Sequence, residues 1–198
     1  MSLLLLKRFL QRPRQVAYIV PSSRTLRKKV SSWMDLSRPR VVVEFGPGEG
    51  CHARHLLKVL PPGSRLLLIE LDPILVPHLH KQFAGIPEVS IHQGDAVRVV
   101  EILRSEGFDY CDYIVSGIPF SWLPQPQKSL ILQQALEALR PEPHSALITY
   151  QVSKELDENG HCAHFGRRFH EFCLANIPPM WVSVFHRLNE VPCVAATP

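Results

Sequence analysis

The sequence predicts an α/β fold: a doubly wound, mostly parallel sheet with helices on both of its faces. Apolar runs of strand length alternate with segments of helical periodicity along most of the 198 residues, as is typical of parallel strands joined by helices. The runs are continuously apolar rather than alternating, as expected for strands that are covered on both faces. Hydrophobic residues make up 45% of the chain, which suffices for a sizeable core and argues against disorder.

The first thirty residues predict two helices. In MSLLLLKRFLQRPRQ, leucines form an apolar side next to Lys and Arg, so this stretch predicts a short amphipathic helix that ends near Pro13. In PSSRTLRKKV, Ser22 or Ser23 can serve as the N-cap of a second helix, and Leu26 with Val30 gives it an apolar stripe.

The strands are expected where apolar runs lie between turn residues. They comprise 41–45, 65–70, 89–96 with a turn at its end, 111–117, 145–153, 180–188 and 191–196.

Helical spacing of apolar residues marks the connections between these strands. The helix of DPILVPHLHKQF should begin with Asp72 as a cap and Pro73 at its first position, and the helix of AVRVVEILRSEG should end at Gly107. The other segments that predict helices are ARHLLKVL (53–60), QKSLILQQALEALR (127–140) and FGRRFHEFCLAN (165–176). The polar stretch 154–164 is expected to be a loop.

Charge is distributed unevenly along the chain. Residues 1–30 contain eight of the 22 Lys and Arg and no Asp or Glu, whereas the remaining 168 residues carry 14 basic and 18 acidic side chains. Such a segment favours an anionic partner, either membrane lipid or nucleic acid, although a solvated helix face would have the same composition. We therefore expect a basic amphipathic segment at 1–30 and a ligand-binding domain at 31–198.

Composition also bears on location and metal content. No apolar run approaches the roughly 20 residues of a membrane-spanning helix, and the four leucines at the N-terminus are too few for a signal-peptide core of about 7–15 residues, so we expect a cytoplasmic protein. The five cysteines have no paired spacing and are expected to be reduced thiols. The ten histidines match no metal-ligand spacing, and no metal site is expected.

The segment EFGPGEG, which follows the strand at 41–45, predicts a ligand-binding loop. Glycine permits positive φ and a close approach of the backbone to a ligand, and the first strand–helix turn of a doubly wound sheet usually contacts one. An acid at the end of the second strand can accept the ribose hydroxyls, and an acid after the third can accept the exocyclic amine of an adenine. The candidate ligand-binding residues are Glu44, Gly46, Gly48, Gly50, Glu70, Asp95, Ala96 and Ser116.

The spacing of this loop differs from the nucleotide-binding motifs of other enzymes. A GxGxxG motif would need a glycine at Cys51, and no GK[ST] is present. The E-x-G-x-G form, with an acid inside the preceding strand, resembles the cofactor loop of class I methyltransferases. The resemblance implies a Rossmann-like methyltransferase sheet and S-adenosyl-L-methionine as the cofactor, with its methionine part next to the loop.

VVVEFGPGEG, LIELDP, QGDA and VSGIPF together resemble the group that contains the ribosomal RNA adenine dimethylases and the bacterial phospholipid N-methyltransferases. Adenine-modifying enzymes usually have Asn-[Leu/Ile]-Pro-[Tyr/Phe] at the fourth motif, where the Asn side chain binds the target amino group and an aromatic ring stacks on the flipped base. Here the Asn position is Ser116 or Gly117. The RNA dimethylases also have a C-terminal RNA-binding domain, for which a chain ending at Pro198 leaves no room.

The phospholipid group resembles the chain over nearly its whole length, through PSSRTLRKKV, SGIPFSWLP, LITYQVS and NIPPMWVSVFHRL. Glu49 and Trp122 depart from its pattern. The resemblance implies successive methylation of the phosphatidylethanolamine amine toward phosphatidylcholine by a peripherally membrane-associated enzyme. The partners implied are the phospholipid substrate and an anionic membrane surface, which the basic segment would bind; nucleic acid is the less favoured partner.

Methyl transfer to an amine needs alignment of the nucleophile with the methyl carbon and an acceptor for the proton of the amine. The candidate catalytic residues are Tyr150, Ser116, Pro119 and Phe120. Aromatic rings, among which Trp122 and Trp181 are further candidates, could stabilise methylated cations. Two alternatives stay open: a methyltransferase for RNA adenine or a small molecule, and a protein that binds the cofactor without catalysis. The sequence does not indicate the oligomeric state.

Overall fold

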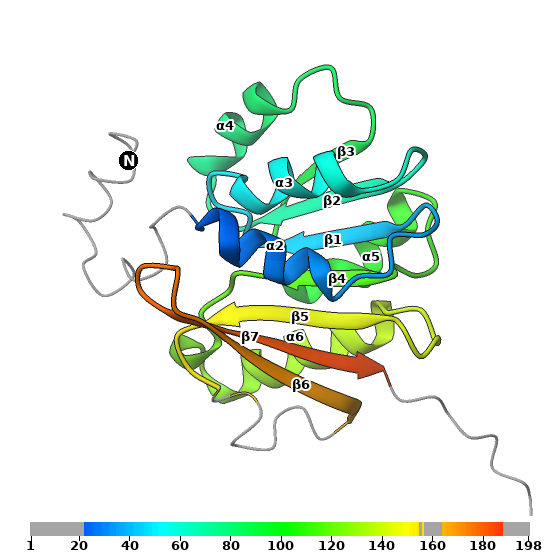
Figure 1. The fold of residues 1–198 in the computed structure, drawn as a ribbon. Helices are drawn as coiled ribbons and strands as arrows, with labels where there is room; N and C mark the ends of the chain where they lie inside the picture. Colours follow the sequence, from blue (N-terminus) through cyan, green and yellow to red (C-terminus); the bar gives the residue numbers. More distant parts are fainter. Residues whose placement is uncertain (1–21, 155, 157–163, 188–198) are drawn as a thin grey trace, which may run out of the picture.

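A computed structural model of the protein describes residues 22–154, 156 and 164–187 (Figure 1). The predicted N-terminal amphipathic helix, most of the predicted loop at 154–164 and the predicted strand at 191–196 lie outside these residues.

A seven-stranded sheet forms the centre of the described part, with the order β3-β2-β1-β4-β5-β7-β6. The first five strands of this order are parallel, while β7 is antiparallel to β5 and to β6. The prediction of a doubly wound, mostly parallel sheet is therefore confirmed. The strands are β1 (Val41–Phe45), β2 (Arg65–Glu70), β3 (Val89–Gln93), β4 (Tyr113–Ser116), β5 (Ala146–Gln151), β6 (Phe165–Cys173) and β7 (Met180–Arg187).

Helices cover both faces of the sheet (Figure 1). On one face, α2 (Arg24–Ser32), α3 (Cys51–Val59) and α4 (Leu75–Gln82) bury apolar side chains against alternate strand residues. On the other face, α5 (Val99–Ser105) and α6 (Gln125–Ala138) pack in the same way. Two short 3-10 helices, η2 (Ala96–Arg98) and η3 (Phe120–Trp122), follow β3 and β4. The central strands β1, β2, β4 and β5 are mostly apolar because both of their faces are covered.

The helix starts agree with the predictions to different degrees. The Ser23 hydroxyl accepts a hydrogen bond from the Leu26 backbone N–H at 3.1 Å, so Ser23 is the N-cap of α2. The start of α4 lies three residues later than Asp72, whose carboxylate instead accepts from the Ile74 N–H at 3.0 Å. This side-chain bond stabilises a turn before the helix, and Pro73 lies in that turn.

The prediction of a helix at 165–176 is wrong, because this segment forms β6. Phe169 and Cys173 are four residues apart, which suggests a helical stripe, but an even spacing also places two side chains on the same face of a strand. Both contact the cluster under α2 and α3, whereas Phe165 packs on the opposite face, across an irregularity in the register between Phe165 and Arg168.

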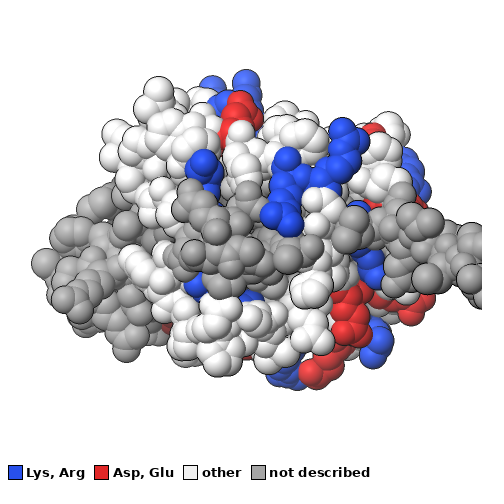
Figure 2. Space-filling model, turned by 90° about the horizontal axis from the view of Figure 1, so that it is seen from below, with Lys and Arg blue, Asp and Glu red and all other residues white. Residues whose placement is uncertain are grey.

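β6 is an edge strand, and charged side chains protect it. Arg167 and Arg168 are exposed, and Figure 2, which views the molecule from below, shows several separate Lys and Arg side chains on that face. Charges on an edge strand oppose pairing with a strand of another molecule.

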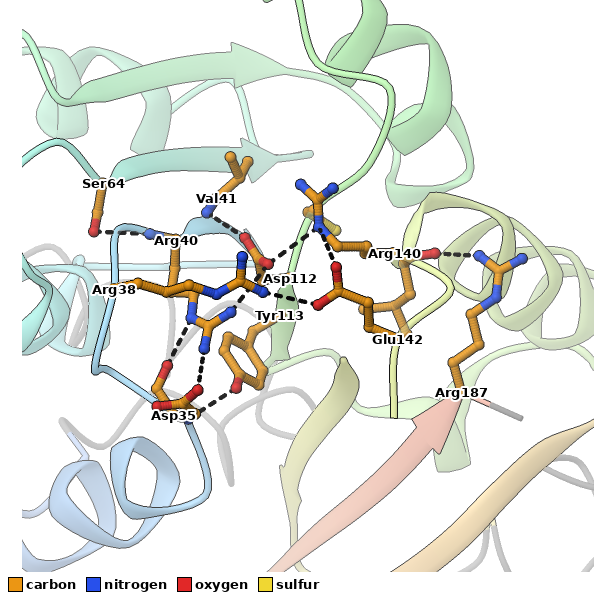
Figure 3. Close-up of polar contacts among 12 residues, drawn as sticks. Asp35, Arg38, Arg40, Val41, Ser64, Asp112, Tyr113, Arg140, Glu142 and Arg187 are labelled. Carbon is orange, nitrogen blue, oxygen red and sulfur yellow. Dashed lines mark hydrogen bonds and ion pairs between the residues drawn. The ribbon is translucent and has the colours of Figure 1, made fainter. Parts of the chain in front are cut away.

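Charged residues also join the segments at the amino ends of the strands (Figure 3). The buried Arg40 guanidinium forms an ion pair with Asp35 and lies 3.4 Å from Asp112 Oδ1. Asp112 Oδ2 accepts from the Val41 N–H at 2.8 Å, and its Oδ1 lies 3.3 Å from Arg140 Nε. The cluster therefore connects β1, β4 and the segment before β5 at the edge opposite to the glycine loop.

Candidate cofactor and acceptor site

The glycine loop between β1 and α3 has the backbone conformation that the sequence predicts. Gly46, Gly48 and Gly50 have φ values of +62°, +57° and +70°. Residues other than glycine rarely adopt such positive values. A Cβ atom at Gly50 would lie 2.5 Å from Gln82 Nε2, whereas one at Gly48 would have nothing within 4 Å. Gly50 thus allows α3 to pack against α4, and Gly48 borders open space.

Glu70, the last residue of β2, fastens this loop. Its carboxylate accepts from the Gly48 N–H at 3.0 Å and from the Asp72 N–H at 2.9 Å. Burial raises the pKa of Glu70, and the backbone hydrogen bonds oppose this rise. The predicted acid at the end of the second strand therefore lies beside the predicted loop.

Glu44 is a buried carboxylic acid whose oxygens have no hydrogen-bond partner among the residues that the structure describes. Its side chain is fully buried. Burial, with a smaller effect of the negative charge of Glu70, raises the pKa of Glu44 to about 8. An unpaired buried carboxylate is costly, and a cation placed beside it would remove that cost.

Tyr150 lies near the end of β5 and is enclosed on two sides. Its ring stacks on the His52 ring with centroids 4.2 Å apart, and a Cβ atom at Gly117 would lie 2.4 Å from its hydroxyl oxygen. Burial raises the pKa of Tyr150 well above its usual range, and the negative charge of Glu44 is the second largest cause of this rise. Ser116 is fully buried as well, and its hydroxyl accepts from the Ile118 N–H at 3.3 Å.

Sequence reasoning missed His52. The ring is buried, and neither of its nitrogens has a hydrogen-bond partner within the described part of the chain, while burial lowers the pKa of His52 to about 3. Its place in the first turn of the helix after the glycine loop is the signal that could have identified it.

Asp95 and Ala96 lie after β3, as predicted. Asp95 Oδ1 accepts from the Val97 N–H at 3.1 Å, and Oδ2 accepts from Gln127 Nε2 at 3.2 Å. Ala96 is buried at the start of η2. Gln127, on α6, has no feature in the sequence that would have indicated this contact.

The structure does not bring all predicted catalytic residues together. Phe120 is fully buried in the cluster under α5 and α6, on the face of the sheet opposite to Tyr150, so it has the position of a packing residue. Pro119 precedes η3 as its N-cap. Trp122 is 44% exposed, and Trp181 contacts Phe172 at a centroid distance of 4.7 Å.

These positions fit S-adenosylmethionine. Glu44, Glu70 and Asp95 follow one another on the adjacent strands β1, β2 and the turn after β3, beside a loop with open space at Gly48. An orphaned buried carboxylate suits the positive charge of a sulfonium compound, and Glu70, at the end of the second strand, has the position from which an acid can accept from ribose hydroxyls. Among the described residues, no group of three or more His, Cys, Asp or Glu could hold a metal ion.

The contact of Tyr150 with Gly117 leads to a stability prediction. We expect Gly117→Ala to lower the free energy of unfolding by about 1–3 kcal/mol, because the added methyl group overlaps the Tyr150 hydroxyl and the ring has little room to move. Thermal denaturation of Gly117→Ala measures this loss, and the double variant Gly117→Ala/Tyr150→Phe should recover part of it. An unchanged melting temperature for Gly117→Ala would contradict the packing described here.

No family profile matches the sequence, but individual proteins do. An ornithine lipid N-methyltransferase from Singulisphaera acidiphila is 27% identical over 138 residues, which are 70% of this chain and 72% of that protein. Ribosomal RNA small subunit methyltransferase A from Methylococcus capsulatus is 47% identical over 57 residues, which are 29% of this chain and 21% of that protein.

The fold also has counterparts among solved structures. TrmN from Thermus thermophilus superposes with a TM-score of 0.64 at 18% identity, over 82% of this chain and 48% of that one. At this identity the likeness concerns the fold alone. Sequence relatives and fold together place the chain in the class I S-adenosylmethionine-dependent methyltransferases, and its cofactor is S-adenosyl-L-methionine.

Proposed function

We propose that the protein transfers methyl groups from S-adenosylmethionine to the amine of a membrane-lipid headgroup, with phosphatidylethanolamine as the acceptor. The observation that carries this proposal is the space at Gly117, which the Tyr150 hydroxyl fills. An Asn side chain, which adenine-modifying enzymes place in this motif, has no room there. The likeness to an ornithine lipid N-methyltransferase supports an acceptor of the same chemical class, a lipid amine.

Glu44 and Glu70 would hold the cofactor in this reaction. When bound, S-adenosylmethionine supplies an activated methyl group on a sulfonium centre. The unpaired carboxyl of Glu44 provides a counter-charge, and Glu70 keeps the Gly48 peptide in place. A cofactor fixed in this way presents its methyl group in one direction, which in-line displacement requires.

Tyr150 would position the acceptor. Because burial keeps the pKa of Tyr150 well above its usual range, its hydroxyl is protonated at neutral pH. It can accept one N–H of the amine and thereby direct the nitrogen lone pair, but it does not serve as a phenolate base. We therefore assign to Tyr150 the orientation of the nucleophile and not the removal of its proton. His52, which stacks on the ring, keeps it in place.

The proposal is tested by incubating the protein with methyl-labelled cofactor and, separately, phosphatidylethanolamine vesicles, ornithine-lipid vesicles and small-subunit ribosomal RNA. We expect label in phosphatidylethanolamine, and we expect Tyr150→Phe to lower kcat by about 10–100-fold while the dissociation constant of the cofactor changes little, since the hydroxyl acts on the acceptor. Label in ornithine lipid alone would change the acceptor but not its class.

Label in RNA and in neither lipid would overturn the proposal in favour of an adenine methyltransferase. The similarity to the ribosomal RNA methyltransferase supports that alternative. If calorimetry detects binding of the cofactor but no acceptor becomes labelled, the protein would be a cofactor-binding protein without transferase activity.

A further inference from the structure

Large apolar side chains are exposed at the carboxyl edge of the sheet, the edge that carries the glycine loop. Leu71 and Ile74 follow β2 and are 64% and 54% exposed; Trp122 follows β4, and Val152 follows β5. A nucleoside held by Glu70 would cover Leu71, which is its neighbour in the chain. No such ligand contact accounts for the side chains beyond β5.

The turn between β6 and β7 carries the most exposed of these side chains. Leu174 and Ile177 are 75% and 79% exposed, and Phe172 is 41% exposed. The register pairs Trp181 of β7 with Gln151 at the end of β5, so this turn lies at the carboxyl edge, beside the end of β5 (Figure 1). Residues 172–183 include no Asp, Glu, Lys or Arg.

The turn is held in place by a buried amide. Asn176 is 1% exposed; its Oδ1 accepts from the Ser23 N–H at 2.8 Å, and its Nδ2 donates to the Pro178 carbonyl at 2.9 Å. These hydrogen bonds fix the turn to the start of α2. The apolar side chains of Leu174 and Ile177 are therefore exposed to solvent on a turn that is held in one place. An exposed apolar patch of this kind marks an interaction site.

Basic residues surround the apolar turn. Lys154 lies 4.6 Å from the centre of the Trp181 ring, and Arg24 is exposed directly after Ser23. Glu171, the acid that precedes the turn, is paired with Lys29. In the sequence, residues 1–21, which precede Ser22, contain four Lys and Arg and no Asp or Glu. An apolar tip with cationic surroundings complements an anionic lipid surface.

We propose that the β6–β7 turn docks the protein on an anionic bilayer, with Leu174 and Ile177 inserted between the headgroups. This inference rests on the proposed function, because the acceptor is then a lipid that has to reach Tyr150 from the membrane. With the turn inserted, the carboxyl edge of the sheet faces the headgroups, and a lipid amine can approach the site without leaving the bilayer.

The test compares the full chain with the variant Leu174→Asn/Ile177→Asn in co-sedimentation with vesicles of phosphatidylglycerol and phosphatidylethanolamine. We expect the partition coefficient to fall at least about 10-fold, because two apolar side chains lose their burial. The loss should persist at high salt, where the contribution of Lys and Arg is screened. The dissociation constant of S-adenosylmethionine should stay within about 2-fold, since neither Leu174 nor Ile177 belongs to the residues that would hold the cofactor.

Leu130→Asn serves as the matched control, since Leu130 lies on α6 and is 45% exposed; it should bind vesicles like the unchanged chain. Equal co-sedimentation of the double variant and the unchanged chain would overturn the docking role even if lipid is methylated. Turn-dependent vesicle binding without methyl transfer to lipid would retain the docking role and reject the proposed function. A loss confined to binding of another protein, with vesicle binding intact, would show that the turn serves a protein partner instead.

Discussion

Glu44→Gln is expected to stabilise the cofactor-free protein at pH 8 and to weaken its binding of S-adenosylmethionine. The carboxyl is fully buried and unpaired, so its ionisation in the folded state costs free energy. An amide of the same shape avoids that cost but provides no counter-charge for a sulfonium. A group that lowers stability in the free protein and raises affinity in the complex has the behaviour expected of a ligand-binding acid.

The direction of the pH dependence follows from the pKa of Glu44, which is raised from 4.5 to about 8. Below pH 4.5 the carboxyl is protonated in both the folded and the unfolded chain, and it has no effect. As the pH rises from 4.5 to 8, the unfolded chain loses the proton while the folded chain retains it, so the free energy of unfolding decreases. The total effect is on the order of a few kcal/mol, and Glu44→Gln removes it.

The measurement is best made between pH 6.5 and pH 8. His52 is held neutral by burial, with a pKa lowered from 6.5 to about 3, so its own effect on stability arises below pH 6.5. In this window the unchanged chain should lose stability with rising pH, and Glu44→Gln should lose less. Glu101→Gln is a matched control on an exposed acid and should follow the unchanged chain. Parallel curves for Glu44→Gln and the unchanged chain would contradict the raised pKa.

Cofactor binding provides a second readout of the same carboxyl. Below pH 8 a cation that pairs with Glu44 displaces its proton, so binding should release a proton and tighten as the pH rises. Calorimetry in two buffers with different ionisation enthalpies detects this release. Glu44→Gln should bind about 10–100-fold more weakly, because the counter-charge of the sulfonium is lost, and should release no proton. Equal proton release by both proteins would place the proton on another group.

Much of the fold could be predicted because β1, β2, β4 and β5 are covered on both faces and are therefore mostly apolar. β6 could not, since an edge strand needs only one apolar face, and the spacing of Phe169 and Cys173 suits a strand and a helix equally. Its edge position depends on the pairing with β7, which no local pattern reveals.

The glycines, Glu44 and Glu70 could be identified because they lie on consecutive strand ends whose order the sequence predicts. The contacts among distant residues could not. His52 meets Tyr150 across 98 positions of the chain, and Gln127 meets Asp95 across 32 positions. The burial of Phe120 likewise depends on which face η3 turns toward, so an aromatic residue predicted to line the site became part of the core.

Asp112→Ala should cause a large loss of stability, far from the site. Asp112 is 5% exposed, accepts from the Val41 N–H and faces the guanidinium groups of Arg40 and Arg140 (Figure 3). Its removal leaves a buried cation and a backbone donor without this partner, so we expect a loss of about 3–5 kcal/mol. For a chain of this size, thermal denaturation should then show a melting temperature about 6–20 °C lower.

Glu142 supplies the matched control, because it belongs to the same cluster and pairs with Arg38 and Arg140 but is 39% exposed at its side chain. Glu142→Ala should cost at most about 1 kcal/mol, since water solvates the charges that are left behind. Asp112→Asn, which keeps an oxygen for the Val41 N–H, should lie between the two. Equal losses for Asp112→Ala and Glu142→Ala would mean that burial of the charge does not determine its contribution, and the cluster would then be a surface network.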